Sequence, residues 1–181
     1  MSIKTNKMAV YLERLRLLAI FAMLGSLMFV SDILMEFLPN MHIVGALMMI
    51  YTVVYRAKAL IPLYVYVFLN GLFGGGIWWY PYLYVWLPLW VLTMLVPRSL
   101  GAGLKVPIYM LICALHGFCF GILYAPFQTF AFGLDFESTV MWIAAGLPFD
   151  IIHGVFNFVA ATLVLPVSSM LMKLENRIRI I

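Results

Sequence analysis

Charged residues are scarce in this sequence. Asp, Glu, Lys and Arg make up 10% of its 181 residues, 66% are hydrophobic, and the mean hydropathy is +1.08. Soluble domains carry roughly a quarter charged residues. The chain therefore has too little polar surface to cover a water-exposed globule of its size. This composition excludes an ordinary soluble protein and predicts one all-α integral membrane domain over residues 1–181.

Several catalytic and energy-converting signatures are also absent. The sequence has no P-loop, no HExxH, no GxSxG and no helix of repeated arginines. Its two cysteines, Cys113 and Cys119, have no metal-site spacing. We therefore expect that the protein is not an enzyme and that it holds no metal or cofactor of its own. Uphill transport by such a chain would need an ion or a partner as its energy source.

Long apolar runs replace these missing features. They are separated by charges, Pro and Gly, and they predict a compact bundle of six membrane-spanning helices. Pro148 and Pro166 lie in the last span, and either is a candidate kink. The predicted spans are about Leu15–Ser31, His42–Tyr55, Ala59–Phe73, Tyr82–Val96, Val106–Tyr124 and Val140–Met172.

The distribution of charge selects the orientation of these spans. With both termini cytoplasmic, all 11 Lys and Arg residues fall on the cytoplasmic side, from Lys4 and Lys7 to Arg179. The charged residues of the outer loops are then all acidic, namely Asp32, Glu36, Asp135 and Glu137. This is the positive-inside pattern, so we assign the net charge of +4 to membrane topology rather than to nucleic-acid binding.

The stretch NGLFGGGIWWYPYLYVW joins a glycine run to dense aromatics at the outer mouth of the third and fourth spans. Irregular backbone at that depth needs protein or a water-filled cavity beside it. Trp78 and Tyr80 are equally consistent with an interfacial aromatic belt. A glycine run beside several rings also suits a pocket for a flat, partly apolar ligand. We predict that the pocket uses Trp78, Trp79, Tyr82 and Trp86.

The last span reads GLPFDIIHGVFNF, in which Asp150, His153 and Asn157 are spaced to share one helical face. A carboxylate near the bilayer centre is expensive, by roughly 2.5–3.5 kcal/mol on insertion scales. Two interpretations are open. The face looks into a ligand cavity, which we favour, or Asp150 pairs with His153 or with His116 on the fifth span and only ties helices together.

The first outer loop, SDILMEFLPNMH, mixes Asp32, Glu36 and His42 with apolar residues such as Leu34 and Phe37. It is either a solvated connector or, as we favour, a lid that packs back over the pocket. Asp32, Glu36 and His42 are therefore also candidate substrate-binding residues.

Small side chains let helix backbones approach closely. The GxxxG pair of Gly117 and Gly121 is expected to serve packing within the chain. The first span carries a second set, for which we predict docking to a partner protein: Ala19, Ala22, Gly25 and Ser26.

The whole chain resembles a substrate-binding S component of an energy-coupling factor (ECF) vitamin transporter. The resemblance lies in size, six spans, LPNMHIVG, YVYVFLNGLFGGGIWWYPYLYVW and PFDIIHGVFNFVAATLVLPV. It implies a vitamin pocket near the outer face in a bacterial cell membrane. It also implies two kinds of partner, a transmembrane scaffold protein and two cytosolic ATPases. The family's AxxxA docking pattern has no literal copy in the first span, which leaves the docking residues open.

Among such subunits the chain looks most similar to the cobalamin type, so cobalamin is the predicted substrate. A flat, polar deazapurine precursor of queuosine is the alternative ligand. Two other classes stay open: a small intramembrane enzyme using Asp150, His153 and His116 as acid and base, and a non-transporting membrane scaffold.

Overall fold

The structure is a computed structural model that describes the backbone of residues 2–179 and the side chains of residues 8 and 10–177. The side chains of Lys4, Lys7 and Arg179, which entered the charge argument, lie outside the described residues. Within this range every regular element is a helix. The elements are α1 (Ser2–Met35), α2 (Val44–Tyr55), η1 (Arg56–Ala59), α3 (Leu60–Phe73), η2 (Tyr80–Leu83), α4 (Leu87–Leu95), α5 (Ala102–Phe118), α6 (Phe120–Phe132), α7 (Phe136–Ala160), η3 (Ala161–Leu163) and α8 (Val164–Arg179).

Four helical stretches are long and apolar enough to cross a membrane: Val10–Met35, Val44–Phe73, Ala102–Phe132 and Phe136–Arg177. A shorter apolar stretch covers Tyr80–Leu95. The chain is thus a helical protein of membrane-spanning character, as the composition predicts. The second stretch contains two helices, α2 and α3, which η1 joins. The chain changes direction at Arg56, the first residue of η1, which has a φ of 57°.

Two breaks interrupt helices that the sequence predicts as continuous. The predicted span Val106–Tyr124 is divided at Cys119, which ends α5 and precedes α6. The last span is divided at η3, directly before α8, whose first turn contains Pro166. Pro166 has no N–H and its ring crowds the carbonyl of Thr162, so the α-helical ladder cannot pass this point unchanged. Pro148, the other candidate kink, lies inside α7 without interrupting it.

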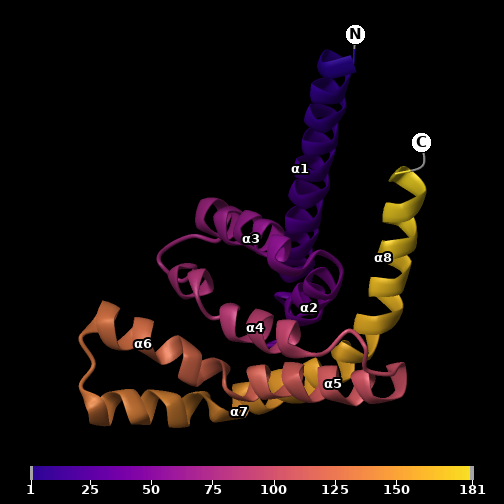
Figure 1. The fold of residues 1–181 in the computed structure, drawn as a ribbon. Helices are drawn as coiled ribbons and strands as arrows, with labels where there is room; N and C mark the ends of the chain where they lie inside the picture. Colours follow the sequence, from indigo (N-terminus) through magenta and orange to yellow (C-terminus); the bar gives the residue numbers. More distant parts are fainter. Residues whose placement is uncertain (1, 180–181) are drawn as a thin grey trace.

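Three helices form a base from which two others project (Figure 1). α5, α6 and α7 lie along one side, with α7 running back beneath α5 and α6. α1 and α8 leave this base in the same direction, so the far ends of both helices lie on the same side of the molecule. An ion pair joins them, Arg16 Nη2 to Glu175 Oε2 at 3.5 Å, and Tyr55 of α2 donates to the same carboxylate at 2.9 Å.

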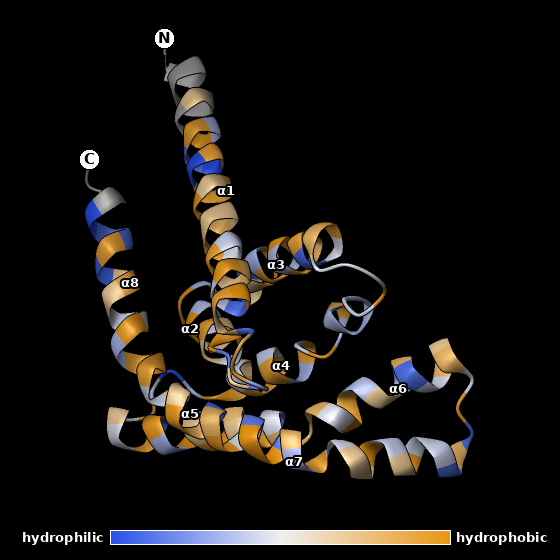
Figure 2. Cartoon of the chain, turned by 180° about the vertical axis from the view of Figure 1, so that it is seen from behind, coloured by the Kyte–Doolittle hydropathy of each residue, from blue (hydrophilic) through white to orange (hydrophobic). Residues whose placement is uncertain are grey.

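The hydropathy of the ribbon follows this arrangement (Figure 2). Apolar residues dominate the helices, while hydrophilic segments gather toward the free ends of α1 and α8 and at the α6–α7 turn. The interior is built around α2, whose Met48, Met49 and Tyr51 are at most 2% exposed. Trp86, before α4, is the largest fully buried side chain.

Glycines set the closest helix contacts. A Cβ on Gly117 of α5 would lie 2.7 Å from the Cα of Gly154 on α7, so the two backbones touch. The packing predicted for Gly117 is therefore within the chain. Gly25 of α1 is also internal, because its Cβ would lie 2.5 Å from the Cβ of Val65 on α3. Of the predicted docking residues, Ala19, Ala22 and Ser26 are exposed and only Gly25 is buried.

Candidate functional site

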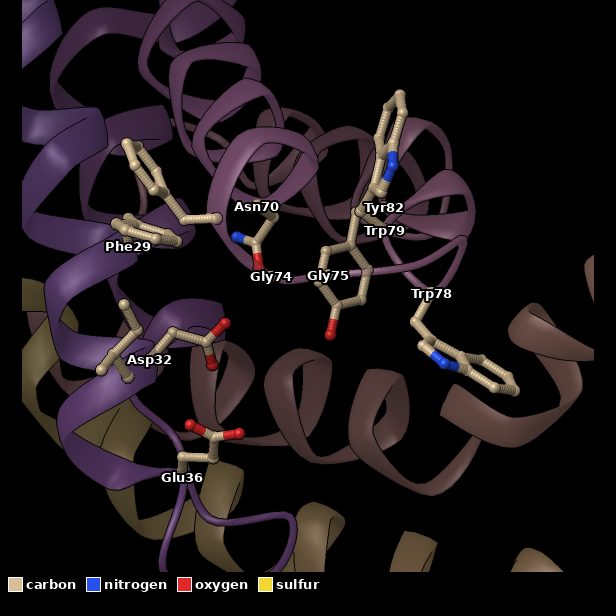
Figure 3. A pocket seen from close by; sticks show the side chains of 11 residues that line it. Phe29, Asp32, Glu36, Asn70, Gly74, Gly75, Trp78, Trp79 and Tyr82 are labelled. Carbon is tan, nitrogen blue, oxygen red and sulfur yellow. The ribbon is translucent and has the colours of Figure 1, made fainter.

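A cavity of about 370 Å³ opens between the end of α1, the end of α3 and the loop that leads into η2. Figure 3 shows the carboxylates of Asp32 and Glu36 entering it from the α1 side, opposite the aromatic side chains of the loop and η2. We call it the outer pocket. It brings together five predicted substrate-binding residues: Asp32, Glu36, Trp78, Trp79 and Tyr82.

Local backbone chemistry positions these groups. Asp32 lies in the last turn of α1, and Glu36 directly follows the helix, so both carboxylates stand at its end. In the loop, Gly75 and Gly76 have φ values of 68° and 69°, which side chains with a Cβ rarely adopt. This turn directs the chain back over α3, where the Trp79 ring covers Gly71.

The loop aromatics are fixed by further rings. Trp79 stacks on Tyr80 with centroids 4.4 Å apart, and Trp78 stacks on Phe132 of α6 at 5.8 Å. Tyr124 of α6 donates to the carbonyl oxygen of Trp78 at 2.7 Å. Trp78 remains 53% exposed, so it suits a pocket rim and an interfacial belt equally well. The dense aromatics therefore hold an irregular loop against α6 as well as lining a cavity.

Tyr66 connects the outer pocket to the interior. Its hydroxyl donates to Asp32 Oδ2 at 2.8 Å, and its ring stacks on Tyr82 at 5.9 Å. Tyr82 lines the pocket and contacts Trp86, 6.2 Å away between centroids. A continuous aromatic path thus leads from the carboxylates to the centre of the bundle.

A buried ring cluster lies at the end of this path. We define it as Trp86 with the three histidines His42, His116 and His153. His116 stacks on Trp86 at 5.2 Å, and His42 and His153 have centroids 4.7 Å apart. The residues come from the α1–α2 loop, the start of α4, the end of α5 and α7. Asn157 follows one turn after His153 and is 0% exposed.

The ring cluster is short of hydrogen-bond partners. His116 Nε2 lies 2.9 Å from the carbonyl oxygen of Val85, and because a carbonyl only accepts, Nε2 must carry the hydrogen. Buried polar atoms normally have a partner, and leaving one without costs about 1–3 kcal/mol. Five atoms of this region are buried without one: His42 Nδ1, Trp86 Nε1, His116 Nδ1, His153 Nε2 and Asn157 Oδ1.

Asp150 has a different environment from the one we expected. Both of its carboxylate oxygens lie 3.1 Å from the backbone N–H of Gly121, in the first turn of α6. Asp150 therefore caps α6 across the break at Cys119, and neither His116 nor His153 is its hydrogen-bond partner. It does share the buried face of α7 with His153 and Asn157, as their spacing predicts.

The segment SDILMEFLPNMH, for which we favoured a lid, only partly folds back over the protein. His42 reaches the ring cluster, whereas Leu34 and Phe37 are 66% and 78% exposed. The apolar side chains that suggested a lid therefore point away from the protein in this structure.

Sequence reasoning missed Tyr66 and Asn70, which stand one helical turn apart in YVYVFLNG. Asn70 lines the outer pocket and Tyr66 holds Asp32. Their four-residue spacing in an otherwise apolar helix was the available signal. The sequence could not identify Asp32 as the partner of Tyr66, because nothing in the sequence of α3 indicates that α1 ends beside it.

Comparisons with known proteins add no family assignment for this arrangement. No family model matches the chain, and neither a curated protein nor a solved structure matches it.

Proposed function

We propose that the protein is a membrane substrate-binding subunit of an importer, of the kind found as S components in ECF vitamin transporters. It captures a vitamin-sized heterocycle at the outer pocket and delivers it inward with a partner energising module. The proposal includes six spans with both termini in the cytoplasm of a bacterial cell.

One observation carries this proposal. The outer pocket adjoins the ring cluster and Asn157 beside it, where five polar atoms have no partner. Trp86 Nε1 can only donate, while Asn157 Oδ1 can only accept, so this region offers both halves of a hydrogen-bonding pattern. Apolar pockets with a few convergent polar groups are typical of small-molecule sites. A ligand edge or ordered water would satisfy these atoms, and a purely structural core would have no need of them.

The lining of the outer pocket favours one kind of ligand. Asp32 and Glu36 are acidic, and no cationic side chain among the described residues lines the cavity. Carboxylates accept hydrogen bonds, and tryptophan faces attract cations. The volume of about 370 Å³ is at the small end of the range for ligand pockets. A flat, donor-rich heterocycle such as a queuosine precursor fits these features better than cobalamin, which stays a prediction from the resemblance.

The arrangement of the helices is compatible with an external energy source. α1 and α8 extend on the same side, and Ala19, Ala22 and Ser26 form an exposed strip on α1. Helices pack closely through such strips. A scaffold protein that carries two cytosolic ATPases would dock there, and the chain itself would contribute binding without catalysis.

Mass spectrometry of small molecules released from gently purified protein tests the proposal first. Calorimetric titration of each released compound, and of cobalamin and deazapurines, follows. We expect one ligand bound with nanomolar affinity and unchanged after incubation. Chemical conversion of the ligand by the purified chain would contradict the proposal in favour of an enzyme. The absence of binding to any vitamin or deazapurine would contradict it in favour of a scaffold.

Two variants place the ligand once it is known. Glu36→Gln removes a charge without changing shape, and Trp79→Ala removes a ring from the wall. Each should weaken binding about tenfold or more, which corresponds to about 1.4 kcal/mol. Phe130→Ala is the matched control, because Phe130 is 91% exposed on α6 and does not line the pocket. Equal affinities in all three variants would show that the ligand binds elsewhere.

A further inference from the structure

A second cavity, of about 520 Å³, lies at the other end of α5 from the ring cluster. It is bounded by the end of α2, the α4–α5 connection, the first turns of α5 and the start of α8. Tyr109, the residue of α5 that lines this cavity nearest to His116, stands roughly 10 Å from it along the helix axis, so the cavity and the ring cluster are distinct. We call it the basic cavity. Its polar lining includes Arg56, Arg98, Lys105, Tyr109 and Ser168.

The charges of the basic cavity all have one sign. Arg56, Arg98 and Lys105 line it, and within the part of the chain that the structure describes no acidic side chain does. Arg56 Nη2 donates to the carbonyl oxygen of Met94 at 2.7 Å, and Lys105 Nζ donates to that of Arg98 at 2.9 Å. These carbonyls hold the cations in place without neutralising them. Three positive charges around one cavity, two of them held by backbone carbonyls, leave it ready for an anion.

Uncharged donors converge on the same cavity. Ser168 is 0% exposed, lines the cavity, and its Oγ has no hydrogen-bond partner. α5 begins here, and no side chain caps its N-terminus at Gly101. The first N–H groups of a helix lack partners within the helix and favour anions. A buried hydroxyl without a partner and an uncapped helix start therefore supplement the three cations.

The remaining wall of the basic cavity is apolar. Val53, Val106, Leu165 and Met172 line it, and Leu104 nearby is 60% exposed. A free phosphate ion would gain nothing from these surfaces, whereas an acyl chain would cover them. Basic pockets between membrane helices on the cytoplasmic side suit anionic lipid headgroups.

We propose that the basic cavity binds the phosphate of an anionic phospholipid, with Arg98, Lys105 and Arg56 around the headgroup and its acyl chains along the apolar wall. This site does not depend on the substrate proposed for the outer pocket, but the assignment of the lipid to the inner leaflet rests on the orientation proposed above. The bound lipid would contact α2, α5 and α8, which all line the cavity.

The test measures the melting temperature of the purified full chain in detergent with added phosphatidylglycerol, and the retained lipid by native mass spectrometry. At lipid levels near 100 times the dissociation constant, we expect a rise of about 5 °C and one retained phosphatidylglycerol. Phosphatidylcholine at the same concentration should give no comparable rise. An equal rise with phosphatidylcholine, or with inorganic phosphate alone, would overturn the lipid assignment.

Variants with equal change in charge locate the effect. Arg98→Gln with Lys105→Gln should lose most of the phosphatidylglycerol shift. Lys58→Gln with Arg177→Gln removes two exposed charges that do not line the cavity, and it should keep the shift. Equal shifts in both double variants would overturn the proposal.

Lys105→Arg provides a folded reference, because it retains the charge and should retain the lipid. If the Arg98→Gln, Lys105→Gln protein is unfolded by circular dichroism, Ser168→Ala replaces it, with a reduced shift expected. A full shift in Ser168→Ala would then count against the proposal.

Discussion

The outer pocket and the basic cavity differ in charge, in aromatic content and in the way their walls are made. The outer pocket has two carboxylates and stacked rings on an irregular loop, whereas the basic cavity has three cations, a helix start and aliphatic side chains. Both involve chain breaks between helices rather than helix interiors. The comparison shows that both cavities open beside places where helical hydrogen bonding is interrupted.

Labelling of single cysteines tests whether the two cavities lie on opposite sides of the membrane, and its outcome is all-or-none. In a background in which Cys113 and Cys119 are replaced by alanine, we introduce Glu137→Cys at the α6–α7 turn or Ser99→Cys beside the basic cavity. Both positions are exposed. With positive residues inside, a membrane-impermeant maleimide should label Glu137→Cys on intact cells and Ser99→Cys only after permeabilisation. The same accessibility at both positions would disprove the proposed orientation.

The next largest effect should come from the helix crossing between the two regions. Gly154→Leu forces a side chain into the ring of Phe118 on α5, at the point where a Cβ on Gly117 would already lie 2.7 Å from the Cα of Gly154. We expect a destabilisation of about 3 kcal/mol, seen as a lower melting temperature and loss of both ligands. Gly146→Leu on the same helix meets open space and serves as the control. A stable Gly154→Leu protein would show that α5 and α7 are not in contact.

Asp150→Ala should have an intermediate effect. Removing a buried acceptor from the start of α6 costs about 1–2 kcal/mol. Asp150→Asn keeps an acceptor and should lose less. If Asp150 only caps α6, ligand affinity corrected for stability should stay within about twofold of the wild type. A tenfold loss in Asp150→Asn at unchanged melting temperature would restore the role in ligand binding that the sequence suggested.

The smallest effect should come from Asp135, which caps α7 from its own helix. Its Oδ1 accepts from Ser138 N at 2.8 Å, and this hydrogen bond holds the pKa of the carboxyl below its usual value. Because the pKa of Asp135 is lower in the folded state, its carboxylate stabilises the protein fully at pH values above the ordinary aspartate pKa of about 3.9. This stabilisation is lost as the pH falls through the lowered pKa. Asp135→Ala should thus lower the melting temperature slightly at pH 7. A difference that persists at acid pH would assign the effect to another cause.

Patterns within one helix were the predictable part of this molecule. The spacing of Asp150, His153 and Asn157 identified a face that is buried, and the glycine run identified the turn at Gly75 and Gly76. The carboxylates of α1 and the loop aromatics were predicted to belong to one site, and the structure places them in one cavity.

Contacts between helices could not be predicted in the same way. Nothing near Asp150 in sequence indicates that its partner is Gly121, and nothing near Gly25 indicates that Val65 covers it. The break at Cys119 also escaped the sequence, because no proline or charge marks it. It depends on a carboxylate supplied by another helix, and apolarity alone specifies only the lengths of segments.

That carboxylate imposes an order on biosynthesis. Gly121 emerges from the ribosome 29 residues before Asp150, so the start of α6 lacks its partner while the earlier helices are already in the translocon. We therefore expect the break between α5 and α6 to become fixed only after α7 has been synthesised, because Asp150 supplies the acceptor for Gly121.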